Sequence, residues 1–291
     1  MARFAAELGF SVEGRTLAAA RANVAGVRDI SAERLREELD KILLSDIRYG
    51  LGSGRVLAGL YLLREAGALE ALLPEVAAGR GIAQRAEYHA HDVEEHMLRA
   101  CACAKPTRTA RLAALLHDVG KPVMVRETGR MLGHDAAGAE LAAGILRRLK
   151  YPNAVQEEVV ALVRCHMYDL NGNAKETTLR RRFALWGAAF TLALADLREA
   201  DVHGSGRIAG EVKSAARWRA VLARMQQEGA PLSAEELRCT GSDIMAWLGI
   251  PASPRVGEIK RALLLHCACH PRDNVPERLQ KIARDIGGLR G

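Results

Sequence analysis

Apolar residues recur at helical spacing along most of this chain. In SAERLREELDKILLS, residues 31–45, the spacing i, i+4, i+8 places Leu35, Leu39 and Leu43 on one helix face. A similar pattern continues through LAGLYLLREAGALEALLPEV, where Pro74 marks a helix end. Strand-like alternation never persists beyond four or five residues. The pattern therefore predicts an all-α protein built as a multi-helix bundle or array.

The chain divides into three helical segments with soft borders. We expect a neck-like region at residues 1–80, a histidine-bearing domain at 81–205 and a basic tail at 206–291. The central helices are predicted at residues 92–104, 109–118, 135–150, 153–167, 177–187 and 189–202, followed by a longer basic helix at about 208–228. Ser233 with Glu236 has the spacing of a capping box.

Composition narrows the class of protein. Hydrophobic residues make up 49% of the chain but aromatics only 4%, so Leu, Ala, Val and Ile fill the core. The net charge is +7, and residues 204–291 carry 14 basic and 9 acidic side chains, a balance that favours polyanions such as RNA but also fits solvated helix faces. Six cysteines without a CxxC pair, no signal peptide and no apolar run of membrane-spanning length predict a cytoplasmic protein without a membrane partner.

Imidazole and carboxylate side chains gather in the central segment, where helices can bring them into one cavity. A mixed nitrogen and oxygen set without thiolate suits a five- or six-coordinate divalent metal with water positions open, and one or two ions of Mn, Ni, Co, Fe, Mg or Zn would fit. A carboxylate beside an imidazole can bridge two metals. The candidate ligands are His96, His117, Asp118, His134, His166 and Asp201.

A lysine follows the adjacent His117-Asp118 pair in a glycine-containing turn. Lys121 is placed to meet a phosphate, and a bound divalent cation makes hydroxide available near neutral pH. Phosphoryl hydrolysis is the reaction that fits, with His117, Asp118 and Lys121 as candidate catalytic residues acting on a nucleotide or RNA phosphoester.

Some residues near this set admit a second interpretation. Asp196 competes with Asp201 as the last carboxylate ligand, and the resemblance of the Ala200-Asp201 pair to a known metal-binding motif favours the latter. His89 and His91 could contact the site or could lie at a solvated helix start.

The second half of the chain offers two weaker candidates. His266 and His270 share a helix face and could form another metal site. The run Arg180, Arg181 and Arg182 could contact RNA or phosphate, or could be a solvated face.

The segments EHMLRA, LAALLHDVGKP and LREADVHG resemble the HD superfamily of metal-dependent phosphohydrolases. GHDAAGAELA and VRCHM resemble its variants with extra histidines, which can hold two metals. The resemblance implies an all-α fold, metal ligands at the matching positions and a phosphoric ester hydrolase. Its expected substrates are nucleotides, cyclic phosphodiesters or RNA 3′ ends.

A wider resemblance covers nearly the whole chain in order. RFAAELGFSVEGRTLAAARANVAGVRDISAERL is similar to the neck of bacterial CCA-adding tRNA nucleotidyltransferases, and PLSAEELRCTGSDIMAWLGIPASPRVGEIKRALL resembles their tail. The glycine-rich turn and DxD of the family's N-terminal head have no counterpart, so this chain alone is not expected to transfer nucleotides. The alternatives are a tRNA-binding body paired with a separate head chain and a non-catalytic helical scaffold; a homodimer is also possible.

Overall fold

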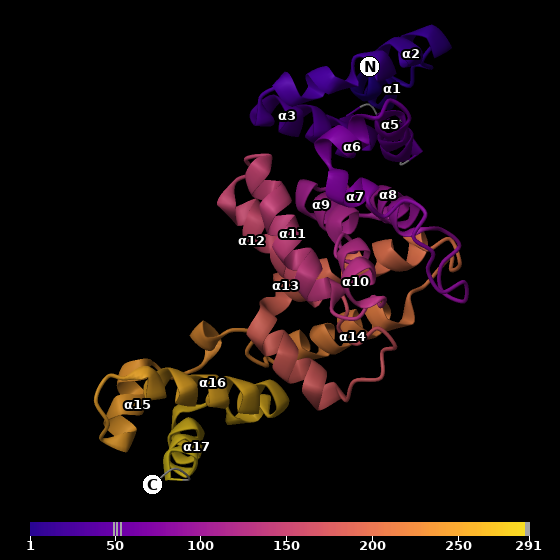
Figure 1. The fold of residues 1–291 in the computed structure, drawn as a ribbon. Coiled ribbons are helices and arrows are strands. Elements are labelled where there is room, and N and C mark those ends of the chain that lie inside the picture. Colours follow the sequence, from indigo (N-terminus) through magenta and orange to yellow (C-terminus); the bar gives the residue numbers. More distant parts are fainter. Residues whose placement is uncertain (49, 51, 53, 289–291) are drawn as a thin grey trace. The chain divides into compact units, whose positions relative to one another are not determined.

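The computed structural model describes residues 1–48, 50, 52 and 54–288, and this part of the chain contains helices but no strand (Figure 1). The first helices are α1 (Ala2–Leu8), α2 (Gly14–Ala22), η1 (Val24–Asp29), α3 (Ala32–Leu43), α4 (Ser45–Arg48), α5 (Gly54–Glu65), α6 (Ala68–Leu72) and α7 (Pro74–Ala77). The central ones are α8 (Val93–Cys103), α9 (Arg108–Leu116), α10 (Lys121–Thr128), α11 (His134–Arg148), α12 (Asn153–Cys165) and α13 (Glu176–Gly204). The last are α14 (Lys213–Gln227), η2 (Ala234–Glu236), α15 (Gly241–Leu248), α16 (Pro254–Cys269), η3 (Pro271–Asp273) and α17 (Pro276–Gly288). The prediction of an all-α fold is confirmed.

The helices form two compact units. The first contains residues 1–168 and 196–212, and the second contains residues 169–195 and 213–291. Helix α13 contributes to both, and its backbone leaves the helical conformation at Gly187, where φ is 77° and ψ is 167°. These units do not coincide with the three predicted segments, whose boundaries stay a prediction.

Helices α1, α3 and α5 pack closely at the start of the first unit. A Cβ on Gly59 of α5 would lie 2.7 Å from Cγ2 of Ile42 and 2.9 Å from Cβ of Ala6. Only glycine therefore allows this approach without displacing a neighbour. The contact buries Ala6, Leu39 and Ile42 in a shared core.

Capping side chains define where the central helices α8 and α9 begin. Asp92 accepts a hydrogen bond from the backbone N–H of Glu95 at 2.8 Å, and Thr107 accepts one from that of Ala110 at 3.3 Å. Arg111 of α9 is buried and donates to the carbonyls of Cys101 and Ala102 at the end of α8, at 2.7 Å each. Helices α8 and α9 are thereby fixed against each other.

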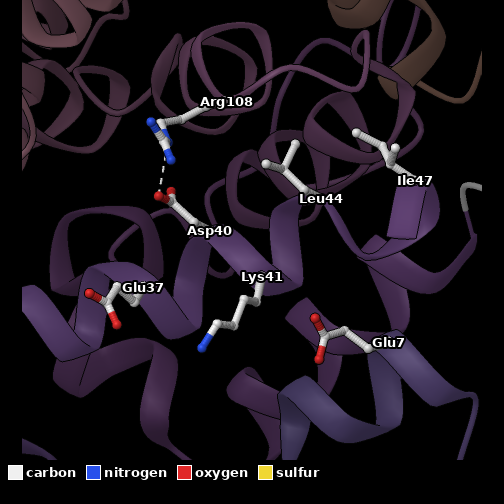
Figure 2. A pocket seen from close by; sticks show the side chains of 7 residues that line it. All are labelled: Glu7, Glu37, Asp40, Lys41, Leu44, Ile47 and Arg108. Carbon is white, nitrogen blue, oxygen red and sulfur yellow. Dashed lines mark hydrogen bonds and ion pairs between the residues drawn. The ribbon is translucent and has the colours of Figure 1, made fainter. Parts of the chain in front are cut away.

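Asp40 of α3 connects the N-terminal helices to the central ones within the first unit. Its carboxylate accepts hydrogen bonds from the Tyr151 hydroxyl at 2.8 Å and from Nε of Arg108 at 2.9 Å. A pocket of about 440 Å³ lies beside this pair, and residues of α1, α3, α4 and α9 line it (Figure 2). Asp40 thus joins α3, α9 and the loop after α11.

The second unit is held by its own polar contacts. Nε1 of Trp218 in α14 donates to Asp169 at 3.0 Å, and α15, α16 and α17 pack against one another. Helix α15 begins with a capping box between Thr240 and Asp243, whereas Ser233 makes no side-chain cap bond, so the expected capping box at Ser233 is wrong. None of the described helices combines the length and apolar content needed to cross a membrane. The cytoplasmic location stays a prediction.

Candidate metal centre

Five separate parts of the first unit supply the six predicted ligands. His96 lies on α8, His117 and Asp118 occupy the turn after α9, His134 begins α11, His166 follows α12, and Asp201 lies in the last part of α13. Asp201 lines the same cluster, and the other five residues are less than 9% exposed. The structure brings all six side chains together, and whether they hold a metal is taken up below as a proposal.

Two glycines let the backbones approach closely enough for these side chains to meet. A Cβ on Gly120, two residues after Asp118, would lie less than 3.0 Å from the backbone of His134 and of Gly138 in α11. A Cβ on Gly204, three residues after Asp201, would lie 2.5 Å from the backbone nitrogen of Ala100 in α8. The turn after α9 can therefore approach α11, and the end of α13 can approach α8, only because these two residues lack a Cβ atom.

The first half of the cluster surrounds Nε2 of His96. This atom lies 3.0 Å from Nε2 of His117, 3.1 Å from Oδ1 of Asp201 and 3.4 Å from Oδ2 of Asp118. Nε2 of His117 lies 3.3 Å from Oδ2 of Asp118 and 3.5 Å from Oδ1 of Asp201. Two imidazoles and two carboxylates thus point into one small volume.

The second half shares Asp118 with the first. Oδ1 of Asp118 lies 3.2 Å from Nε2 of His134 and 3.6 Å from Nε2 of His166, and these two nitrogens are 3.1 Å apart. Because Oδ2 faces the first half and Oδ1 the second, Asp118 occupies the position of a bridging carboxylate. The arrangement can accommodate two neighbouring cations.

Hydrogen bonds on the far side of the rings fix the donor atoms. The Nδ1 atoms of His117, His134 and His166 lie 2.8, 2.7 and 2.6 Å from the carbonyl oxygens of Ala114, Met131 and Val163. A carbonyl can only accept, so Nδ1 carries a proton, and in each neutral ring Nε2 presents a lone pair to the cluster. Lone pairs facing each other at 3.1 Å repel unless a proton or a cation lies between them. This donor set fits a divalent metal.

The charges of the cluster depend on one another. Burial would lower the pKa of His117, but the carboxylates of Asp118 and Asp201 raise it to about 10. Burial would raise the pKa of both carboxyls, but the imidazoles hold each well below its usual range. Burial lowers the pKa of His166. Deprotonated carboxylates are the form that binds a cation.

The side chain of Lys121 points into the cluster of imidazoles and carboxylates. Its Nζ lies 2.5 Å from Oδ2 of Asp118 and 2.7 Å from Oε1 of Gln84, and the side chain is almost fully buried. The ammonium therefore neutralises Asp118. The expected contact with a phosphate does not follow from this position. Sequence gave no signal for Gln84.

The competing candidates lie elsewhere. Asp196 pairs with Lys105 at 2.8 Å, outside the cluster. His266 of α16 pairs with Asp273 at 2.7 Å, and the ring centroids of His266 and His270 are 4.7 Å apart. Among the described residues, no group of three metal-ligating atoms includes this histidine pair.

His89, in contrast, lies beside the cluster, edge-on to His96 with ring centroids 4.7 Å apart. Burial and nearby positive charge lower the pKa of His89 to about 4.

The arginine run separates into buried and exposed members. Arg180 is 8% exposed, donates to the carbonyl of Ala268 at 2.8 Å and pairs with Glu228, so it holds the second unit together. Arg181 and Arg182 are exposed, and the guanidinium of Arg182 lies 5.5 Å from the ring centroid of Trp186.

A pocket of about 520 Å³ in the second unit includes Trp186 in its lining. Lys260 and Arg261 of α16 also line it, together with the acidic Glu235. The side chain of Arg261 makes no hydrogen bond or ion pair with any residue that the structure describes. The pocket thus combines an aromatic ring with basic groups.

Two family profiles match adjacent stretches of the chain. Residues 80–203 match the profile described as "HD domain", and they include all six clustered residues. The chain contains an HD domain. Residues 9–79 match "Probable RNA and SrmB- binding site of polymerase A". The predicted relationship to the HD superfamily and to the body of CCA-adding enzymes is confirmed.

Two curated relatives of this HD-domain chain are tRNA nucleotidyltransferases by name, and a third is named a Multifunctional CCA protein. The A-adding tRNA nucleotidyltransferase of Deinococcus radiodurans is 35% identical over 90% of this chain and 61% of its own length. The CC-adding tRNA nucleotidyltransferase of Thermus thermophilus is 36% identical over 90% of this chain and 60% of its own length. The Multifunctional CCA protein of Chromobacterium violaceum is 38% identical over 53% of this chain and 37% of its own length. The chain thus spans about three fifths of the first two relatives.

A solved structure shares the fold of the HD-domain chain. The Bacillus stearothermophilus CCA-adding enzyme, solved with CTP, superposes with a TM-score of 0.67 at 23% identity, covering 99% of this chain and 60% of that one. At this identity the likeness establishes the fold alone.

These names overturn the predicted enzyme class. We predicted a metal-dependent phosphoric ester hydrolase without nucleotidyltransferase activity, with His117, Asp118 and Lys121 as its catalytic residues. The Deinococcus and Thermus relatives are named tRNA nucleotidyltransferases and not hydrolases, so the predicted class is wrong. The hydrolytic roles of the three residues are not carried forward. A ligand set that resembles that of a phosphohydrolase does not by itself specify hydrolysis, because one fold and its site residues can serve different functions.

Proposed function

We propose that this chain is the tRNA-binding body of a tRNA nucleotidyltransferase. The observation that carries the proposal is the similarity of 35% and 36% to two such enzymes along 90% of the chain. The RNA-binding profile over residues 9–79 supports tRNA as the partner. Nucleotidyl transfer is proposed as the activity of the enzyme to which this body belongs, and tRNA positioning as the contribution of the described residues.

The pocket beside Trp186 is the RNA contact that we propose in the second unit. Arg182, Lys260 and Arg261 supply positive charge around an aromatic ring, and basic groups beside aromatic rings favour RNA phosphates and unstacked bases. Arg180 is assigned a structural role because its guanidinium is already bound inside the unit. Arg181 remains a predicted contact.

Binding of tRNA by the full chain tests the proposal. Fluorescence anisotropy with labelled tRNA should show an affinity that falls steeply with salt, because binding releases counterions from the phosphates. The double variant Lys260→Glu/Arg261→Glu should weaken binding and lower the salt slope by about two, since each lost phosphate contact lowers it by about one. Arg284→Glu, exposed on α17 and outside the pocket lining, is the matched control. No tRNA binding at low salt by the unaltered chain would contradict the function itself.

We propose that the clustered residues hold one or two divalent metals. His96, His117, Asp118 and Asp201 would hold the first, and His134 and His166 with the second oxygen of Asp118 would hold another. When bound, the metal would neutralise the carboxylates and could polarise a phosphate oxygen or a water. Mn²⁺ should raise the melting temperature of chelator-treated protein, whereas a non-catalytic scaffold without a metal site would show no shift.

Two predicted assemblies remain to be tested. A separate chain carrying the nucleotidyltransferase head should co-purify with this one when both are expressed together, and the pair should add nucleotides to tRNA. A homodimer should appear at twice the chain mass of 31.5 kDa in light scattering. A monomeric chain that co-purifies with no such head would contradict both predictions. The proposal of tRNA binding would be unaffected, because a separate measurement tests it.

A further inference from the structure

One ligand histidine lacks the support that the other three possess. His117, His134 and His166 each have a carbonyl oxygen within 2.8 Å of Nδ1. His96 is 0% exposed, yet its Nδ1 makes no hydrogen bond with any described residue. A buried N–H without an acceptor costs about 1–3 kcal/mol, so this atom calls for a partner.

The candidate partner is the ring of His89. The two rings meet edge-on with centroids 4.7 Å apart, and Nδ1 of His89 is also buried without a hydrogen bond among the described residues. Two unpartnered nitrogens therefore occupy neighbouring rings. One neutral imidazole can donate through Nδ1 while the other accepts through the same atom.

Backbone contacts hold the loop that carries His89 against the cluster. The N–H of Ala90 donates to the carbonyl of Ser205 at 2.9 Å, just beyond the end of α13. The N–H of His89 donates to the carbonyl of Arg85 at 3.0 Å, and Gln84 of the same loop contacts Lys121. The position of His89 is thus set by the fold rather than by its own side chain.

We propose that His89 is a positioning residue for His96. A small rotation of the His89 ring lets its Nδ1 accept from Nδ1–H of His96, which leaves Nε2 of His96 as a lone pair aimed at the metal. His89 would do for His96 what backbone carbonyls do for the other three histidines. This inference rests on the proposed metal centre and adds to it a residue outside the six ligands.

The test measures metal affinity rather than activity. In calorimetric titration of chelator-treated full chain with Mn²⁺, His89→Phe should weaken binding by about 10–100-fold, the usual effect of losing a partner behind a ligand. His89→Gln keeps a hydrogen-bond acceptor and should recover most of the affinity. His91→Phe, two residues further along the same loop, should bind as the unaltered chain does.

Each outcome decides between roles. Equal affinity for His89→Phe and the unaltered chain would overturn the inference. A loss that His89→Gln does not restore would indicate a packing role and would also overturn it. Absence of Mn²⁺ binding in the unaltered chain would overturn the metal centre and the role of His89 together, while tRNA binding would still report on the proposed function independently.

Discussion

Nζ of Lys121 lies 2.5 Å from Oδ2 of Asp118, the carboxylate that both halves of the cluster share. The two residues are three apart, at the turn between α9 and α10, and both side chains are buried. Because Gln84 accepts from the same ammonium, Lys121 is held at the edge of the cluster. The lysine thus neutralises a ligand of the proposed metal centre.

Removing this ammonium should destabilise the protein. Lys121→Met removes the ammonium that pairs with Asp118 and donates to Oε1 of Gln84, and it should lower the free energy of unfolding of chelator-treated protein by about 1–3 kcal/mol. Urea denaturation followed by circular dichroism measures the change. Lys105→Met is the matched control, because the 62%-exposed Lys105 pairs with Asp196 at the surface and such pairs contribute about 0–1 kcal/mol. Equal losses for the two variants would contradict a special role for the buried contact.

The two candidate carboxylates on α13 should differ in their effect on metal binding. Asp201→Asn should weaken Mn²⁺ binding strongly, since Oδ1 of Asp201 lies 3.1 Å from Nε2 of His96. Asp196→Asn should leave the affinity unchanged because Asp196 pairs with Lys105. Calorimetric titration of both variants gives the comparison, and the reverse ranking would refute the assignment of Asp201.

Metal stoichiometry should depend on the second half of the cluster. If two ions bind, the double variant His134→Ala/His166→Ala should reduce the count from two per chain to one, because His96, His117, Asp118 and Asp201 remain. Elemental analysis after equilibration with Mn²⁺ and desalting provides the number. An unchanged count would show that His134 and His166 hold no metal.

The close backbone approach at Gly120 makes a prediction for stability. Gly120→Ala places a methyl group less than 3.0 Å from backbone atoms of α11, so the elements must separate, and the cost should be about 1–3 kcal/mol or more. Gly144→Ala is the control: its Cβ would meet nothing within 4 Å on an exposed part of α11. That change should stabilise by about 0.5–1 kcal/mol. Thermal unfolding of both variants measures the difference.

Much of the helical framework and all six clustered residues could be predicted from sequence. Periodicity located α11 and α12 to within a few residues, and Gly187 falls where the prediction separates two helices, at residues 187–189. The short α10 was missed because Gly120-Lys121-Pro122 resembles a loop, although proline is well tolerated in a first helical turn. Adjacent ligand types and their order were enough to predict the cluster.

Other features depend on contacts that no local pattern records. Lys121 turns inward because Gln84 and Asp118 meet it in space, and neither spacing nor residue type indicates that meeting. Arg180 looks like its neighbours Arg181 and Arg182 in sequence, yet a distant carbonyl and carboxylate bury it. The predicted reaction class was wrong for a related reason. A set of candidate metal ligands limits which ions fit, but it does not determine which reaction the surrounding protein carries out.

The geometry of the cluster is sensitive to substitution at Gly120 and Gly204. Neither coordinates anything, yet the clearance that each provides sets how far apart imidazoles and carboxylates stand. A single added methyl group at either position should weaken metal binding by the proposed centre even with all six candidate ligands present. In a relative of this protein, an intact set of histidines and aspartates is therefore insufficient grounds for expecting a working centre unless both small residues are also retained.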